Sequence, residues 1–474
     1  MSRIAITRHM LTLSLLAALW PLSGRGDSAD EIRARNLKLV AELRAALPAS
    51  VLNDPNVLVL PGLVANRTRK TVRFYAESTG IGEAEPVEFF IIAHNSGHDY
   101  EALAVSFAMP SDIHRAMEFV GLPAGTPVDP KNLRMWPRGE RVLIDFSWPV
   151  PATKLKKPKQ IPVEHFIMDG RTQKPMKQEG FLFVGSRMSP SLTDSNEMVY
   201  AADKIAPNSI AANYNEPTTV FDLTRRGSKS EQYNHLSSNP EYSIARGSLI
   251  EVLIRPKYTD GRAHIEDLRL TVTAAERGGV LYSLKGASKR TLLTDGSLPA
   301  LLATFEELAV ADKDLYVTLT IGPAVALAQT RKVCAALTAI EGPDGIRMEP
   351  PPDGQLYYQA FVPNPEFRER AKRFTQPWEL HIAHNGKNIS GRLVRIEERR
   401  DEEPQWQETS YPARTAAELA KTLVRVSAEQ RAAGAFIPPA MVVYVPGDVT
   451  HAAFMDLIAE ARKTHPLIHV FVPD

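Results

Sequence analysis

The sequence predicts an α+β protein with a β-rich N-terminal domain followed by two tandem β-β-α-β-α-β sandwich domains. Short runs of β-branched and aromatic residues, separated by turns and prolines, fill residues 58–256. From residue 263 onward, the order strand, strand, helix, strand, helix, strand occurs twice, offset by about 110 to 125 residues. The expected organisation is a signal peptide (1–26), a helical lead-in (27–60), the β-rich domain (61–256) and two sandwiches (257–365 and 366–474).

The first residues are typical of a secretory signal peptide. Arg3 and Arg8 give a positive start, residues 10–20 are apolar, and Gly24 and Gly26 fit the small-residue positions of a cleavage site. The apolar run is too short for a comfortable membrane span, and no later segment is apolar enough to make one. We therefore expect cleavage after Gly26 and a periplasmic or secreted protein. The alternative is an uncleaved signal anchor.

Composition excludes several classes of function. The net charge of +1 provides no global field that would attract nucleic acid. Cys334 is the only cysteine, which excludes an intramolecular disulfide, a cysteine-ligated iron–sulfur cluster and a Cys-based zinc site. Its position on an expected helix predicts a small buried apolar side chain. The sequence contains no P-loop, Rossmann fingerprint, Gly-x-Ser-x-Gly or His-Glu-x-x-His motif, and we expect no cofactor.

Within the N-terminal half, two segments are expected to be helical. Residues 27–47 begin with the capping candidates Asp27 and Ser28 and carry leucines near helical spacing. A second helix is expected after Pro110, with Ser111 as its N-cap and Gly121 at its end. The other periodic runs are expected strands, at residues 72–76, 87–92, 103–107, 142–146, 180–184 and 249–254.

The two C-terminal halves follow the same order of elements. In the first, strands are expected at 268–274, 279–284, 315–321 and 355–361, and helices at 298–308 and 324–340. In the second, strands are expected at 378–383, 392–396, 440–445 and 467–472, and helices at 416–430 and 451–463. The final strand lacks the lysines that usually protect an exposed edge. It is therefore expected to be an interior strand, or to be covered by the first half or by a second molecule in a homodimer.

One stretch of the β-rich domain resembles the YdjY-domain family of bacterial exported proteins. In residues 97–122, a strand starting at Glu101-Ala-Leu leads through Pro110-Ser-Asp-Ile-His114 into a short helix that ends at Gly121. Residues 181–186, 199–203 and 210–215 followed by Pro217 continue the similarity. The resemblance covers about 190 residues and implies no particular activity.

The second C-terminal half is similar to the periplasmic domain of the ExbD/TolR family. The similarity lies in the strand that follows Pro377, the helix led by Ala416, and residues 442–448 leading into a helix and a last strand. That family carries an N-terminal transmembrane helix with an essential acidic residue. Since no span adjoins the domain here, the resemblance implies a sandwich fold, self-association and contact with cell-wall material or envelope partners, without energy transduction.

Glu101 and His114 are the first candidates for chemistry. Glu101 starts the apolar face of its strand, and His114 borders the apolar stripe of the following helix. A short connection joins the two elements, so the carboxylate could orient the imidazole as a general acid/base pair or in a metal site. The alternative is a structural hydrogen bond that allows both groups to be buried.

A second candidate is a loop site for zinc or copper formed by His94, His98, Asp99 and His114. Asn95-Ser-Gly97 favours a turn over a helix, so the two loop histidines do not share a helix face. The alternative interpretation is a solvent-exposed turn.

Taken together, these features predict an exported envelope protein that binds or scaffolds, with envelope proteins or cell-wall material as partners. The competing hypothesis is a metal-dependent or hydrolytic periplasmic enzyme that uses the Glu101/His114 region. The two differ in whether these side chains converge on an open cleft or are occupied by hydrogen bonds inside the fold.

Overall fold

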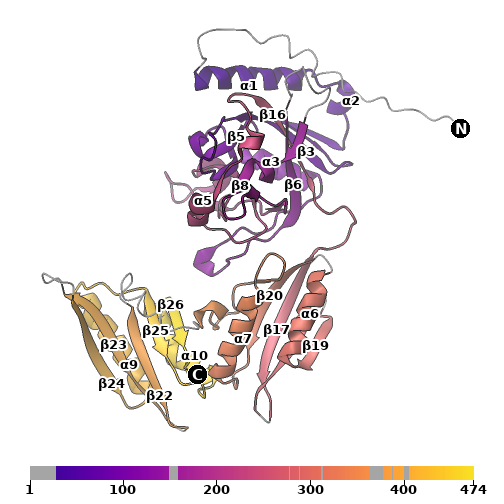
Figure 1. The fold of residues 1–474 in the computed structure, drawn as a ribbon. Helices are drawn as coiled ribbons and strands as arrows, with labels where there is room; N and C mark the ends of the chain where they lie inside the picture. The colour runs from indigo at the N-terminus through magenta and orange to yellow at the C-terminus, as the bar shows by residue number, and fades with distance from the viewer. Residues whose placement is uncertain are drawn as a thin grey trace. The chain divides into compact units, whose positions relative to one another are not determined.

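The computed structural model describes residues 28–148, 159–276, 278–287, 289–310, 313–361, 377–386, 388–399 and 405–473 (Figure 1). The predicted signal peptide lies outside these residues. The chain forms two compact units: unit 1 comprises Met1–Val128 and Pro137–Arg262, and unit 2 comprises Asp129–Trp136 and Ala263–Asp474. The predicted mixed α+β, strand-rich class is confirmed, with several sheets. None of the described helices is both long and apolar enough to cross a membrane.

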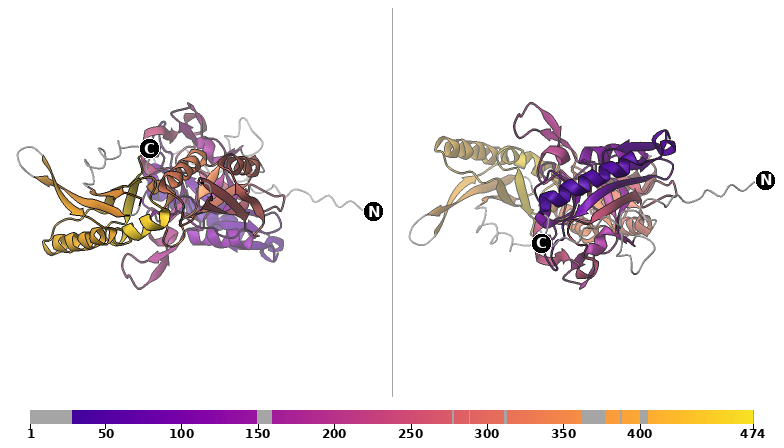
Figure 2. Two further views of the ribbon diagram at one scale, coloured as in Figure 1. Left: turned by 90° about the horizontal axis from the view of Figure 1, so that it is seen from below. Right: turned by 90° about the horizontal axis from the view of Figure 1, so that it is seen from above.

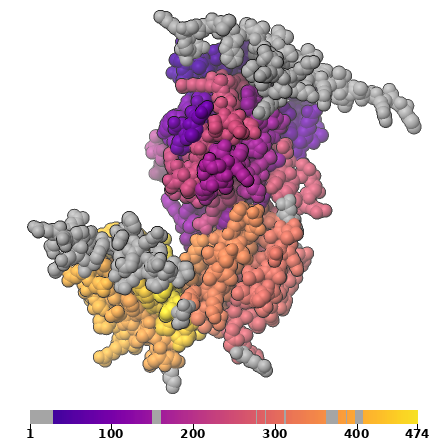
Figure 3. Space-filling model, viewed as in Figure 1, coloured from indigo at the N-terminus to yellow at the C-terminus, as the bar shows by residue number. Residues whose placement is uncertain are grey.

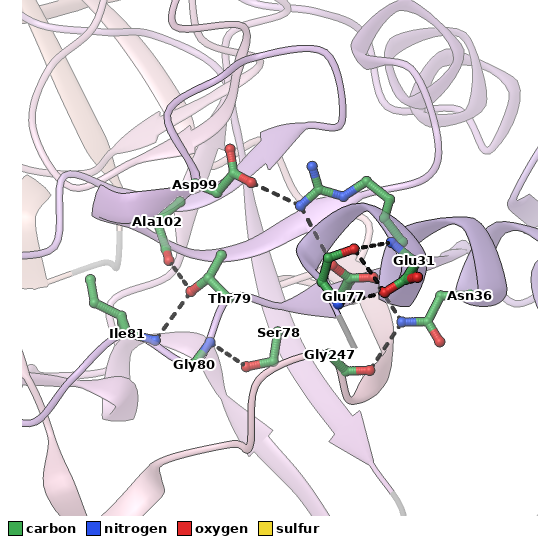
Figure 4. Close-up of polar contacts among 12 residues, drawn as sticks. Glu31, Asn36, Glu77, Ser78, Thr79, Gly80, Ile81, Asp99, Ala102 and Gly247 are labelled. Carbon is green, nitrogen blue, oxygen red and sulfur yellow. Dashed lines mark hydrogen bonds and ion pairs between the residues drawn. The ribbon is translucent and has the colours of Figure 1, made fainter. Parts of the chain in front are cut away.

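The expected lead-in helix is α1 (Ala29–Ala45), followed by the short α2 (Ala49–Leu52). Ser28 and Glu31 form a capping box, in which Ser28 Oγ accepts from Glu31 N and Glu31 Oε2 accepts from Ser28 N. Asn36 faces the body of unit 1, where its Nδ2 donates to Glu77 Oε2 at 2.8 Å and to Gly247 O at 3.0 Å (Figure 4). Polar contacts therefore fasten α1 to the sheet.

The main sheet of unit 1 closes on itself. The strands run in the order β1 (Val57–Leu60), β2 (Leu63–Asn66), β3 (Thr71–Ser78), β16 (Leu249–Pro256), β6 (Glu140–Trp148), β10 (Phe181–Phe183), β14 (Phe221–Leu223), β13 (Ser209–Ala212), β4 (Phe89–Ala93) and β5 (Ala102–Ser106). The β5 strand also pairs with β3, with Ala76 opposite Ser106, and β7 (Lys159–Pro162) pairs with β6. The enclosed core is strongly aromatic, because Phe74, Phe90, Phe146 and Phe181 are all buried.

Shorter elements surround the main sheet. They comprise the ribbon β11 (Met188–Pro190) and β12 (Met198–Tyr200), the sheet β15 (Leu236–Ser238), β8 (Ile167–Asp169) and β9 (Lys174–Pro175), the helices α3 (Pro110–Phe119), α4 (Ala201–Lys204) and α5 (Lys229–His235), and the 3₁₀ turns η2 (Asp99–Glu101), η4 (Val163–Phe166) and η5 (Pro240–Tyr242).

The expected N-cap of α3 is wrong. The helix begins at Pro110, whose missing N–H and preset φ suit a first helical position. Ser111 lies inside the first turn, and its backbone N–H donates to Asp203 Oδ1 at 2.9 Å. A carboxylate from α4 therefore accepts from one of the free backbone N–H groups of the first turn, whereas the Ser111 side chain does not act as the N-cap. The predicted apolar stripe is present, since Ile113 and Met117 are fully buried.

Unit 2 contains two sheets with one strand order, each five-stranded over the described residues (Figures 1 and 2). The first sheet is β19 (Thr291–Gly296), β18 (Val280–Gly286), β17 (Ile265–Ala274), β20 (Asp314–Ile321) and β21 (Ile346–Met348), with helices α6 (Leu298–Val310) and α7 (Leu327–Ile340). The second is β24 (Gln405–Ala413), β23 (Ile389–Arg399), β22 (Trp378–His384), β25 (Ala440–Tyr444) and β26 (Leu467–Phe471), with helices α9 (Ala416–Ala432) and α10 (His451–Thr464).

The strand count and one strand position differ from the prediction. The edge strands β19 and β24 were not expected, so each sheet has one strand more than the sequence indicated. The expected strand at 355–361 is wrong, because this segment contains the 3₁₀ turn η6 (Tyr358–Ala360) and the last strand of the first sheet is β21. The prolines at 350–352 follow β21 after Glu349 and lack the N–H donors that would extend it.

The terminal strand β26 lies at the edge of the second sheet, where Phe361 forms a parallel bridge to Val470. A segment that follows the first sheet thus covers part of this edge, which was one of the three expected arrangements. Backbone bonds also join the two halves, from Leu327 N to Val449 O and from His451 N to Val325 O, at 2.9 and 2.8 Å. One hydrophobic cluster contains residues of both sheets. The space-filling view in Figure 3 draws the first half of unit 2 in salmon to orange and the second half in orange to yellow.

A fully buried arginine lies beside the first sheet of unit 2. Arg347 Nη1 is 2.8 Å from Asp314 Oδ1, and its Nη2 donates to Pro343 O at 2.9 Å. The guanidinium carbon lies 5.5 Å from the centre of the Tyr316 ring and 5.7 Å from that of Trp136. Trp136 in turn donates from Nε1 to Glu341 Oε1 at 2.7 Å, which anchors the segment Asp129–Trp136 with its turn η3 (Pro130–Asn132) in unit 2.

We predict that Asp314→Asn lowers the free energy of unfolding by about 3–5 kcal/mol, because it leaves a buried cation without its counter-charge. Glu429→Gln is the control, since it breaks the exposed Arg425–Glu429 pair and should cost at most about 0.5 kcal/mol. Urea denaturation would measure both. Equal small losses would show that the Arg347–Asp314 pair does not support the fold.

Acid should destabilise the second sheet of unit 2 through His451, which is buried at the start of α10. Burial lowers the pKa of His451 from its usual 6.5 to about 4. The folded state therefore binds fewer protons than the unfolded state, and stability falls as the pH drops from about 6.5 towards 4, by about 1–3 kcal/mol for this group. We expect His451→Gln to lose less stability than the wild type between pH 7 and pH 4 in thermal denaturation. Identical pH profiles would contradict this.

Candidate functional site

The predicted Glu101–His114 contact is wrong. Glu101 ends the turn η2 just before β5, and its Oε1 lies 2.7 Å from His98 Nδ1. His114 lies on α3, where its Nδ1 is 2.9 Å from Gly185 O and 3.0 Å from Tyr200 Oη. The two candidates therefore have separate hydrogen-bond partners, and the short connection between strand and helix does not bring them together.

The surroundings of His114 are closely packed. Its ring meets Phe183 edge-on at a centroid distance of 5.3 Å, and Nε2 is 3.5 Å from Glu118 Oε1. Gly185 has a positive φ of 77°, and a Cβ at this position would lie 2.9 Å from His114 Cε1. Glycine is thus required here both by the backbone conformation and by the approach of the imidazole. The arrangement packs a partly buried imidazole against a backbone carbonyl and two aromatic rings.

The four metal candidates make different contacts. Asp99 Oδ2 pairs with Arg33 Nη2 of α1 at 2.9 Å (Figure 4). Burial alone would raise the pKa of Asp99, but the hydrogen bond and charge of Arg33 bring it below its usual value. His98 pairs with Glu101, and the buried His94 Nδ1 has no partner among the described residues. Within the described ranges, no three His, Cys, Asp or Glu side chains are grouped so that they could hold a metal ion.

The structure instead places Glu101 in a polar cluster around a buried carboxylate, Glu88. We use "Glu88 cluster" for Glu88, His98, Glu101, Lys229 and Tyr233. Glu88 and Glu101 precede the parallel neighbours β4 and β5, and Glu88 N donates to Glu101 O at 2.9 Å. Lys229 Nζ lies 2.8 Å from Glu88 Oε2, and the Tyr233 hydroxyl donates to Glu88 Oε1. The side chain of Glu88 is 1% exposed.

In the Glu88 cluster, the carboxyl groups of Glu88 and Glu101 both interact electrostatically with the ammonium group of Lys229. Burial is the largest cause of the raised pKa of Glu88, and the negative charge of Glu101 acts in the same direction. The hydrogen bond with Lys229 opposes that rise and at the same time raises the pKa of Lys229. The charge of Lys229 is therefore the principal compensation for the buried Glu88 carboxylate.

An aromatic ring adjoins this ion pair. Lys229 Nζ lies 5.8 Å from the centre of the Tyr214 ring, which packs against Phe89 at 5.9 Å. The Tyr214 hydroxyl donates to Glu216 Oε2 at 3.1 Å. Burial first, and then the nearby Glu216 and Glu88 charges, raises the pKa of Tyr214. The ring therefore remains neutral and can take part in a cation–π contact.

Glu88, Lys229 and Tyr233 were not among the residues singled out from the sequence. Glu88 interrupts the apolar run 87–92, and a charged residue inside such a run is a usable signal. Lys229 and Tyr233 carry no comparable signal. Tyr233 is 145 positions from Glu88, and only the tertiary fold brings α5 to β4.

Residues 63–225 match the model of the YdjY domain. The match supports the YdjY family and covers the segments that carried the resemblance. In the structure these segments meet at α3, where Gly185 and Tyr200 contact His114 and Asp203 accepts from Ser111. The match includes Glu88 and Glu101 but ends before Lys229.

Other comparisons add little. No curated protein matches the chain. A solved protein of unknown function with an actin-like ATPase fold, from Bacteroides thetaiotaomicron VPI-5482, aligns with 46% of this chain and 94% of its own length. The identity is 10% and the TM-score is 0.14, so this similarity carries no argument.

We predict that His114→Ala lowers the free energy of unfolding by about 1–3 kcal/mol, because it removes a partly buried hydrogen bond and ring packing. Glu118→Gln is the matched control on the same helix, since Glu118 is exposed and its loss should cost within about 0.5 kcal/mol. Chemical denaturation of both variants would test this. An unchanged midpoint for His114→Ala would show that the imidazole does not support the fold.

Proposed function

We propose that the protein is an exported binding or scaffolding protein of the bacterial cell envelope, in which Glu101 and His114 have no catalytic role. One observation carries the proposal: these two side chains are occupied by separate intramolecular partners, His98 and the Gly185–Tyr200 pair. A general acid/base pair needs both groups near one reacting atom. Their separation therefore favours the binding hypothesis over the hydrolytic one.

The organisation of unit 2 supports a scaffolding role. We propose that its two halves are tandem sandwiches of the ExbD/TolR type, an interpretation supported by the identical strand order β19-β18-β17-β20-β21 and β24-β23-β22-β25-β26. Envelope proteins or cell-wall material are the proposed partners, with self-association through this half as a further mode. Export is supported by the charged, apolar and small-residue segments of residues 1–26.

Fractionation of bacteria that express the full chain tests export. We expect a periplasmic protein that starts at Asp27, whereas a control without residues 2–26 should remain cytoplasmic. Retention of the uncleaved chain in the cytoplasm would contradict export.

Cross-linking in intact cells tests the binding role. Glu101→Gln and His114→Gln should recover the same envelope partners as the wild type, because neither residue is assigned to catalysis. Their folding is checked by circular dichroism. A hydrolytic activity that Glu101→Gln abolishes without unfolding the protein would contradict the proposal.

A further inference from the structure

Helix α5 is attached to unit 1 in an unusual way. All seven of its residues are described, and Gln232 is the only buried one. The helix thus lacks the apolar stripe by which a surface helix normally packs. Its inward contacts with the Glu88 cluster are polar, from Lys229 and Tyr233 to the same carboxylate.

The burial of Gln232 reduces the stability that α5 gains by packing on unit 1. The residue is fully buried, and neither its Oε1 nor its Nε2 has a hydrogen-bond partner among the described residues. It follows Lys229 by three positions and precedes Tyr233, so it belongs to the side of α5 that faces Glu88. A buried amide without partners typically costs about 1–3 kcal/mol. A group that supplied hydrogen bonds here, or a movement of α5, would remove that cost.

Lys229 lies largely in solvent, although it pairs with a buried carboxylate. Its side chain is 56% exposed, whereas that of Glu88 is 1% exposed, so the ammonium sits at the mouth of a buried anionic position. Because the Lys229 side chain is already largely hydrated, its movement into solvent changes its own hydration little, but it leaves the Glu88 carboxylate without compensation. An ionised Glu88 therefore needs a cation at this position, and the cation need not be Lys229.

We propose that α5 is a displaceable latch over a binding site for a primary ammonium group, with Lys229 as the internal occupant. Glu88 and Glu101 provide the negative charge, the Tyr214 ring provides a cation–π surface, and Gln232 provides an unused donor and acceptor. The compact NH₃⁺ of Lys229, 2.8 Å from Glu88 Oε2, shows the charge and size that the position accepts. The inference rests on the proposed binding function and specifies its ligand class as an alkylammonium, such as the free amine of a peptide side chain.

Nα-acetyl-lysine amide is a suitable probe, and its Nε-acetylated form, which lacks the charge, is the matched control. Calorimetric titration of residues 27–474 at about pH 8, where carboxyl groups are ionised, should give a weak dissociation constant of about 1 mM or above for the wild type. Lys229→Met removes the internal competitor and should strengthen binding about 10-fold or more. Lys229→Arg keeps a competing cation and should not gain affinity.

Glu88→Gln in the Lys229→Met background should abolish binding, because the remaining site lacks the buried charge. Hydrogen exchange of the α5 amides should increase when the probe binds to the wild type, and circular dichroism confirms that each variant is folded. Equal affinity for the acetylated control, or no binding of the probe to folded Lys229→Met, would overturn the proposal. The cross-linking experiment remains independent: if the partners are recovered while the probe does not bind, only this inference fails.

Discussion

The pairing of β5 with both β4 and β3 is the constraint on which the organisation of unit 1 depends. This pairing closes the main sheet, so that β5, which follows Glu101 directly, has a hydrogen-bonded strand on each side. Since β4 and β5 are parallel neighbours, the residues just before them are brought together, and Glu88 must lie next to Glu101. The same closure fixes the exit from β5 into α3, which then packs on β2 and carries His114 away from Glu101.

Burial of Glu88 at this junction determines the character of the surrounding surface. A carboxylate removed from water needs a cation or a proton, and the fold supplies Lys229 from α5, whose only buried residue is Gln232. Unit 1 contains two other groups of polar contacts, around His114 and around Arg33. The His114 network ends on a carbonyl, and Arg33 joins Asp99 to α1.

Unit 2 is stabilised by apolar packing and by the buried Arg347–Asp314 ion pair. The two sheets share a hydrophobic cluster, and the backbone bonds between the start of α7 and the start of α10 join the halves. Arg347 pairs with Asp314 and lies beside two aromatic rings, one of which comes from Asp129–Trp136. Cys334 is buried in this core, as expected from its position on an apolar helix face, and burial raises the pKa of its thiol.

Sequence periodicity by itself determined the helices and the central strands of both sheets, because their burial patterns repeat within a few residues. It did not reveal β19 and β24, whose edge positions leave their sequences polar, and it misplaced the last strand of the first sheet. Motif order determined the YdjY resemblance. Only the tertiary structure decided that Asp203 caps α3 and that Lys229 meets Glu88. These contacts join residues far apart in the chain or on separate local elements, and the closed sheet, rather than any local pattern, sets the distances between them.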